Sequence, residues 1–140
     1  MRFLAVFLWS CFLATPVFAD DVVTTGKDLT TEVWQGKALT ATFRVGICYN
    51  ARGKANGVLL LKHRNGQVDT YHLNGTLKNN EFYLTHSSGH RLSGSLKGPD
   101  SMQGNAKLAN GLGLGLKGER IRNVPLAAAD CAPLPGRDYR

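Results

Sequence analysis

Turn residues punctuate this chain about every ten positions, and this spacing constrains the fold more than any other feature. Asn65-Gly66 is a strong signal for a two-residue hairpin. Ser87-Ser88-Gly89, Gly98-Pro99-Asp100 and Asn110-Gly111 follow it at similar intervals. No long amphipathic helical pattern stands between these turns, so the intervening segments are expected to be strands of an all-β fold.

The segments between the turns predict about eight strands. Apolar and polar residues alternate from Leu39 to Ile47, which is typical of a half-buried strand. A weaker strand is expected before it at residues 29–34, and others at 58–64, 67–77, 81–86, 90–97, 101–108 and 112–121. This pattern predicts one antiparallel up-and-down β-barrel or barrel-like meander. It resembles lipocalin and avidin barrels in outline only, and such an outline does not indicate a function.

A phrase with a central glycine recurs in three of these segments. LNGTLK at 73–78 matches LSGSLK at 92–97, and MQGNAK at 102–107 is a weaker copy. Gly75, Gly94 and Gly104 share the parity of their apolar neighbours, so they are expected to face inward and permit the bends that close a small barrel. In the run 110–118, glycine alternates with leucine, so one face of that strand lacks side chains. The C-terminal segment is the favoured cover for that face, and direct approach by a ligand is the alternative.

The N-terminal end of the chain predicts export. Arg2, an apolar run of about a dozen residues and Val17-Phe18-Ala19 form the pattern of a cleaved secretory signal peptide over 1–19. The expected location is therefore the periplasm or the extracellular space. A barrel domain is expected over 20–121, followed by a Pro- and Ala-rich arm over 122–140. Cys48 and Cys131 remain after cleavage, and an even count in an exported chain predicts a disulfide that tethers the arm.

The positive charge of the chain is concentrated in one interval. The formal net charge is +7, and no acidic residue occurs between Glu32 and Asp69. Candidate binding residues in this interval are Arg52, Lys54, Lys62 and Arg64. They form either a footprint for an anionic partner or an ordinary solvated surface. Nucleic acid is not expected as the partner, because aromatic residues are not interleaved with the basic ones.

A second candidate site lies at the predicted hairpin that begins at His86. It comprises His86, Ser87, Ser88, His90 and Arg91. Two imidazoles across a hairpin can bind zinc or copper, but no Asp, Glu or Cys between residues 82 and 99 completes a metal site. We therefore expect a polar loop without metal or cofactor. Ser88, His86 and Asp100 are the residue types of a catalytic triad, but the sequence shows no strained turn that would present a nucleophile. We therefore expect that the protein is not an enzyme.

The expected two-residue turn at Asn65-Gly66 also predicts which side chains enter the barrel. Val58 and Leu60 would face the lumen, and Lys62 would form an ion pair with Asp69. An outer apolar patch with a basic rim would then be a docking surface, or would be covered by the N-terminal segment or the arm. Its members are Leu59, Leu61, Val68, His63, His72 and Arg64.

Two functions follow as hypotheses. The first is an exported, non-catalytic protein that binds a macromolecule through the loops at 49–54 or 86–91. Examples are an inhibitor or immunity protein of a secreted hydrolase, or a binder of an anionic envelope glycan or lipid. The alternative is a carrier that holds a small apolar ligand in the barrel lumen. The chain is not expected to span a membrane.

Overall fold

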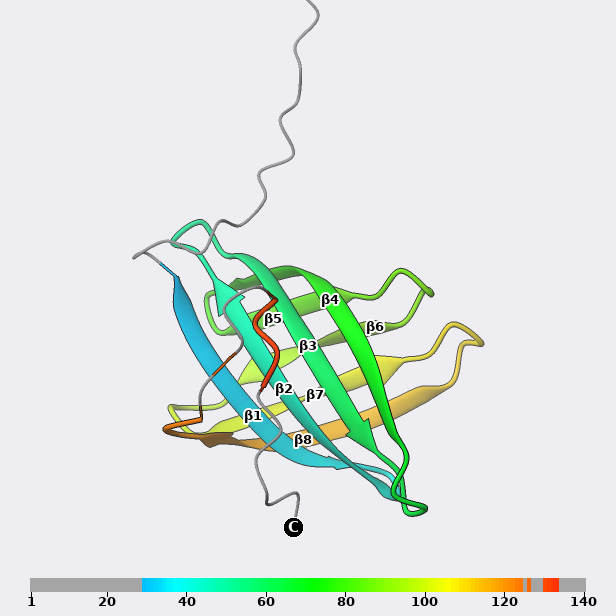
Figure 1. Cartoon of the computed structure of the whole chain (residues 1–140). Helices are drawn as coiled ribbons and strands as arrows, with labels where there is room; N and C mark the ends of the chain where they lie inside the picture. Colours follow the sequence, from blue (N-terminus) through cyan, green and yellow to red (C-terminus); the bar gives the residue numbers. More distant parts are fainter. Residues whose placement is uncertain (1–28, 125, 127–129, 134–140) are drawn as a thin grey trace, which may run out of the picture.

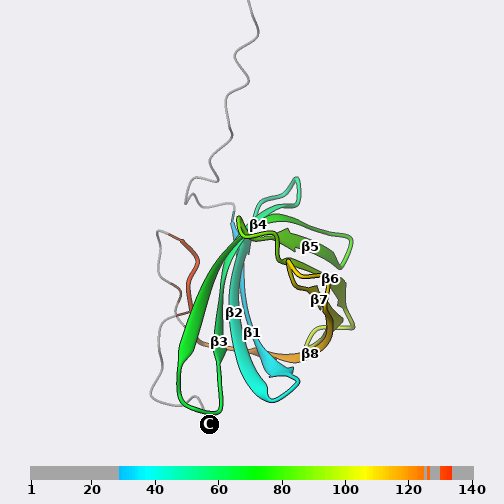
Figure 2. The same ribbon diagram turned by 90° about the vertical axis from the view of Figure 1, so that its right-hand side faces the viewer.

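Eight strands form a closed antiparallel barrel in the computed structural model, which describes residues 29–124, 126 and 130–133 (Figures 1 and 2). Each strand pairs with the next, and β8 pairs with β1 to close the ring. The predicted up-and-down barrel is therefore confirmed, while the predicted signal peptide lies outside the described residues. Within these ranges, no helix is long and apolar enough to cross a membrane. The strands are β1 (Thr30–Ala38), β2 (Ala41–Tyr49), β3 (Lys54–Lys62), β4 (Val68–Lys78), β5 (Glu81–Thr85), β6 (Arg91–Leu96), β7 (Ser101–Lys107) and β8 (Gly113–Ile121).

The up-and-down order gives the barrel two unlike ends. The β1–β2, β3–β4, β5–β6 and β7–β8 turns gather at one end, which we call the mouth and which lies on the right in Figure 1. The other three turns, the start of β1 and the end of β8 lie at the opposite end, which we call the base. Figure 2 views the barrel from the side of the mouth.

Alternate residues of all eight strands fill the barrel. The inward glycines are confirmed: a Cβ added at Gly94 would lie 2.5 Å from the Cα of Gly104 and 2.7 Å from the Cζ of Phe82. One added at Gly75 would collide with the backbone of β5. Glycine therefore lets neighbouring strands and the Phe82 ring pack without a gap. The largest buried side chains include Trp34, Ile47, Leu73 and Leu84.

A buried polar cluster closes the base. Glu32 accepts hydrogen bonds from Trp34 Nε1 at 2.9 Å, from the Tyr49 hydroxyl at 3.0 Å and from Arg120 Nη2 at 2.7 Å. The Arg120 guanidinium also lies over the Trp34 ring, 4.9 Å from its centroid. Burial raises the pKa of Tyr49, and the negative charge of Glu32 raises it further. The three donors satisfy the buried Glu32 carboxylate, although Nε of Arg120 is buried without a hydrogen-bond partner among the described residues.

Four turns share one geometry that the sequence pattern did not reveal in advance. In each, a glycine in fourth place adopts a φ between +84° and +92° and donates its N–H to the carbonyl of the first residue. This is a tight turn followed by a left-handed glycine rather than a two-residue hairpin. The turns are Asn50–Gly53, His63–Gly66, His86–Gly89 and Leu108–Gly111.

The longer turn corrects the predicted pairing of β3 with β4. Lys62 pairs with Val68 and Leu61 with Asp69, so the register differs by one residue from the expected one. A one-residue shift moves every side chain to the other face. Leu59 and Leu61 therefore face the lumen, Val58 and Leu60 face outward, and the predicted outer patch of Leu59 and Leu61 does not exist.

The same shift changes the partner of Asp69. Lys62 and Asp69 lie on opposite faces of the β3–β4 hairpin, so the predicted ion pair between them is wrong. Asp69 instead pairs with His63, whose Nε2 lies 2.8 Å from a carboxylate oxygen.

Leu39 was expected inside the second strand, and this expectation is also wrong. The β1 strand continues to Ala38, and Leu39 with Thr40 forms the turn to β2. Leu39 has a φ of +54°, which is rare for a bulky residue, and 73% of it is exposed.

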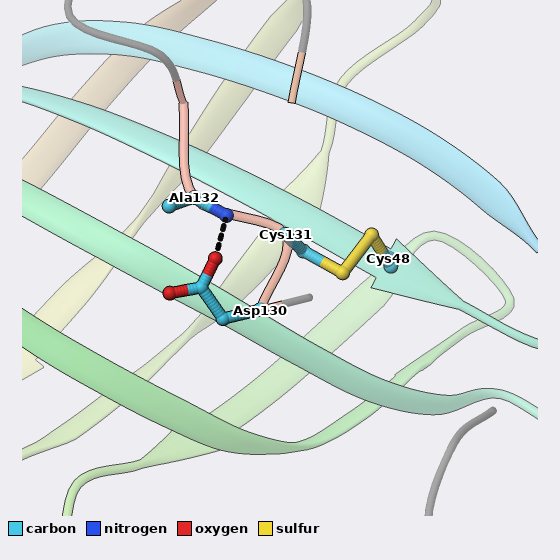
Figure 3. Close-up of a disulfide and its surroundings, with 4 residues drawn as sticks. All are labelled: Cys48, Asp130, Cys131 and Ala132. Atoms are coloured by element: carbon cyan, nitrogen blue, oxygen red, sulfur yellow. Dashed lines mark hydrogen bonds between the residues drawn. A yellow bond between two sulfur atoms is a disulfide. The ribbon is translucent and has the colours of Figure 1, made fainter. Parts of the chain in front are cut away.

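The predicted disulfide between Cys48 and Cys131 is confirmed, and it holds the arm against the barrel (Figure 3). The arm covers the outer face of β2: a Cβ added at Gly46 would lie 2.2 Å from the Cys131 carbonyl oxygen. The described residues of the arm therefore lie on β2, and the expected cover over the glycine-rich β8 is not seen among them. No atom of the described residues lies within 4 Å of a Cβ added at Gly113 or Gly115, so these residues leave that face open.

Candidate binding site

The half of the barrel nearer the mouth contains an apolar cavity of about 70 Å³. Among the described side chains that line it, only those of Tyr71 and His90 carry nitrogen or oxygen atoms. Deep lining residues such as Val45 and Leu73 are buried, whereas Leu61 and Leu108 near the mouth are partly exposed. The cavity therefore reaches toward solvent at the mouth. The other lining residues are Ala38, Phe43, Leu59, Leu92, Met102, Ala106, Leu114 and Leu116.

Three aromatic rings meet at the edge of this cavity. The Tyr71 ring lies edge-on to the imidazoles of His86 and His90, with centroid distances of 5.3 and 5.5 Å. The two imidazoles are stacked 6.0 Å apart. Tyr71 comes from β4, whereas the histidines flank the β5–β6 turn, so strand pairing across three strands assembles the cluster.

A carboxylate anchors the tyrosine of this cluster. Asp69 accepts hydrogen bonds from the side chains of His63 and Gln67, each at 2.8 Å, and from Tyr71. The bonds from His63 and Gln67 hold the pKa of Asp69 below its ordinary value. Burial raises the pKa of Tyr71, and the neighbouring Asp69 charge raises it further. The Tyr71 hydroxyl is therefore a neutral donor at physiological pH.

The hydrogen bonds of the two histidines determine their chemistry. The backbone N–H of Ala109 donates to Nδ1 of His90 at 3.1 Å, and that of Ser88 donates to Nδ1 of His86 at 3.2 Å. In the neutral rings these contacts place the proton on Nε2, which makes Nε2 a donor. A histidine that binds metal through Nε2 needs the opposite tautomer. Among the described residues, no group of three His, Cys, Asp or Glu side chains could hold a metal ion.

Exposed apolar side chains surround the mouth. Leu39 and Leu112 lie in the β1–β2 and β7–β8 turns, with exposed fractions of 73% and 53%. Val68, at the start of β4, is 46% exposed. We call these three residues the collar. With Tyr83, they are the large hydrophobic residues that are exposed in the described part of the chain.

The structure divides the predicted binding residues between the two ends. Arg52 and Lys54 lie at the base, in and after the β2–β3 turn. The basic interval therefore does not form one surface, and within it Arg44 is buried on β2. The other predicted residues gather at the mouth, and their role in binding stays a prediction: Lys62, Arg64, His86, Ser87, Ser88, His90 and Arg91.

Sequence reasoning missed Tyr71, Asp69 and His63 as parts of one site. The recurrent glycine in fourth place of the turns was the signal that could have found them, because it fixes the register of β4. The side chains of Ser88, His86 and Asp100 do not come together as a catalytic triad. His86 contacts Ser88 within their turn, at 2.6 Å, whereas Asp100 lies at the base and pairs with Arg122. The expected absence of catalysis stays a prediction.

Comparisons of this chain with protein-family models, with curated protein sequences and with solved structures found no match.

Proposed function

We propose that this protein is an exported, non-catalytic binder of a small amphiphile, whose apolar end enters the cavity at the mouth. The observation that carries the proposal is the apolar wall of that cavity, which opens beside a cluster of hydrogen-bond donors. Ligand sites of this kind combine an apolar lining with a few placed polar groups. The disulfide between Cys48 and Cys131 suits the oxidising compartment that export implies.

The size of the cavity limits how much of the ligand enters. Its 70 Å³ is well below the roughly 300–1,000 Å³ of pockets that enclose a drug-sized ligand. Only a few carbon atoms fit, and each buried methylene contributes about 0.8 kcal/mol. The adjoining part of the ligand, outside the cavity, would contact the collar of Leu39, Leu112 and Val68. The protein is thus proposed to hold the end of a ligand rather than to enclose it.

The rim selects the polar part of the ligand. Nε2 of His90 is a donor at the edge of the cavity, whereas the Tyr71 hydroxyl donates its hydrogen bond to Asp69. Arg64 and Arg91 are exposed at the same end of the barrel. This arrangement favours a ligand whose apolar chain ends in a group rich in acceptor oxygens, such as a carboxylate.

A cavity-filling substitution tests the proposal. Ala106→Leu adds three carbon atoms to the wall of the cavity, whereas Ala109→Leu adds the same atoms at an exposed position in the β7–β8 turn. The assay titrates disulfide-intact protein with the uncharged fluorophore N-phenyl-1-naphthylamine and then displaces it with octanoate. We expect one site per chain, an affinity at least about tenfold lower in Ala106→Leu, and no change in Ala109→Leu.

Two results would refute this function. One is an unmodified protein that binds neither compound. The other is an Ala106→Leu variant that binds both as tightly as the unmodified chain while its circular dichroism shows the native barrel. The inhibitor hypothesis remains a separate prediction. Its two candidate loops lie at opposite ends of the barrel, so one partner would contact only one of them.

A further inference from the structure

The outer face of β5–β8 carries a continuous polar depression on the side of the barrel away from the arm. Three shallow hollows of about 860, 650 and 420 Å³ adjoin one another there. The first two share Ser95, the last two share Tyr83 and Ser93, and the first and last share Asn105. Figure 2 shows β5, β6 and β7 on the right and β8 along the lower edge, whereas the described part of the arm lies on the left. We call this depression the polar face.

Strand register arranges the polar face in three rows. The middle row runs through Thr76, Tyr83, Ser93, Asn105 and Gly115, which are neighbours on five successive strands. Four inter-strand spacings make this row about 19 Å long. A second row, about 7 Å toward the base, contains Gln103, Lys117 and Lys37. A third row, equally far toward the mouth, contains Arg91 and Lys107.

The charge of the polar face is strongly positive. Six basic side chains line the three hollows against two acidic ones, an excess of four positive charges. All six are exposed, and none forms an ion pair with another residue that the structure describes. The carboxylates of Glu32, Asp69 and Asp100 are paired elsewhere. The basic residues are Lys37, Lys78, Arg91, Lys97, Lys107 and Lys117.

We infer that the polar face binds an acidic polysaccharide chain laid along the middle row. Hydroxyl and amide groups of Ser93, Asn105 and Gln103 can exchange hydrogen bonds with sugar hydroxyls. The cationic rows flank this path on both sides and match carboxylates on the polymer. Tyr83, 48% exposed, offers a ring against which a sugar ring can stack.

Other anionic macromolecules fit the polar face less well. A protein partner would need an apolar core at the interface. Four large hydrophobic residues are exposed in the described part of the chain, and of these only Tyr83 lies on this face. Single-stranded nucleic acid would need several exposed aromatic rings along its path. Among the described residues of this face, Tyr83 alone offers one. The inference does not rest on the amphiphile site. The two sites have only Arg91, Ala106 and Leu116 in common, and none of the variants below changes these residues.

The test measures binding of a fluorescently labelled alginate oligomer by anisotropy, with the disulfide-intact protein at low salt. Neutral dextran, poly-glutamate and oligo-dT of matched length are the comparison probes. The charge variant is Lys107→Glu with Lys117→Glu, and its matched control is Arg52→Glu with Lys54→Glu at the base. We expect alginate affinity to fall at least about tenfold in the first pair and less than about threefold in the control.

A neutral substitution separates a defined path from charge alone. Gly115→Val places a side chain on the middle row, where an added Cβ meets no atom within 4 Å. Its control is Thr70→Val, at an exposed position on the outer face of β4. We expect Gly115→Val and Tyr83→Ala each to weaken alginate binding about fivefold or more, and Thr70→Val to leave it unchanged.

The outcomes are distinct. Preference for alginate over poly-glutamate and oligo-dT, together with sensitivity to Gly115→Val, supports the inference. Equal binding of all three polyanions with no effect of Gly115→Val or Tyr83→Ala overturns it, as does an equal loss in the control charge pair. Binding of N-phenyl-1-naphthylamine should be the same in every one of these variants. A negative result with alginate would therefore not refute the amphiphile proposal, which is tested separately.

Discussion

Replacing Arg120 by methionine should destabilise the barrel by removing the one cation from the cluster that closes the base. The Glu32 carboxylate is nearly inaccessible, since its side chain is 4% exposed, and Arg120 is 24% exposed. Breaking a fully buried pair by removing one partner costs about 3–5 kcal/mol. Trp34 and Tyr49 still donate to Glu32, and Arg120 is partly solvated, so we expect a smaller cost of about 2–3 kcal/mol.

Urea unfolding at pH 7, followed by the fluorescence of Trp34, measures this cost. Arg122→Met is the matched control, because Arg122 also pairs with a carboxylate, that of Asp100, but both side chains are about 60% exposed. Exposed pairs contribute about 0–1 kcal/mol, so the control should unfold almost as the unmodified protein does. Glu32→Gln combined with Arg120→Met completes a double-mutant cycle, in which we expect a coupling of about 1 kcal/mol or more.

The reasoning about the base would be refuted by equal free energies of unfolding in Arg120→Met and Arg122→Met. A coupling near zero between Glu32 and Arg120 would refute it too, since the two side chains would then contribute independently.

Two further predictions concern packing and pH. Gly94→Ala should cost about 2–3 kcal/mol in urea unfolding, because its Cβ would overlap the backbone of Gly104, whereas Gly113→Ala meets no atom within 4 Å and should not destabilise the barrel. An equal effect of both substitutions would contradict the inward packing of Gly94. In carboxyl NMR, Asp69 should titrate with a pKa below the ordinary value of 3.8. In His63→Ala this pKa should rise. Because that pKa is lowered, ionised Asp69 stabilises the fold above about pH 4, and this contribution is lost as the pH falls through the lowered pKa. An unchanged titration in His63→Ala would exclude the His63 bond as the cause.

Much of the fold followed from local pattern. Period-two alternation and turn residues predicted all eight strands and their order, because a strand exposes alternate side chains whatever it pairs with. The inward direction of Gly94 followed from the leucines on either side of it. The disulfide followed from an even number of cysteines in a chain that looks exported.

The candidate binding site was only half predictable. His86 and His90 were recognised because a short turn separates them in the sequence. Their contact with Tyr71 was not, because the β4 register depends on the backbone conformation of Gly66. The polar face could not be predicted from the sequence either, because it brings together residues between positions 37 and 117 that share no local motif.

The amino-acid sequence by itself determined an all-β chain, its strand order, its inward glycines and its disulfide. Tertiary structure decided three things: the β3–β4 register, the docking of the arm at Gly46, and the contrast between a closed base and an open mouth. The physical reason is distance along the chain. Closure of the barrel pairs Val33 with Ile121 and brings Glu32 to Arg120. Contacts between residues so far apart in the chain cannot be predicted from the local alternation of apolar and polar residues.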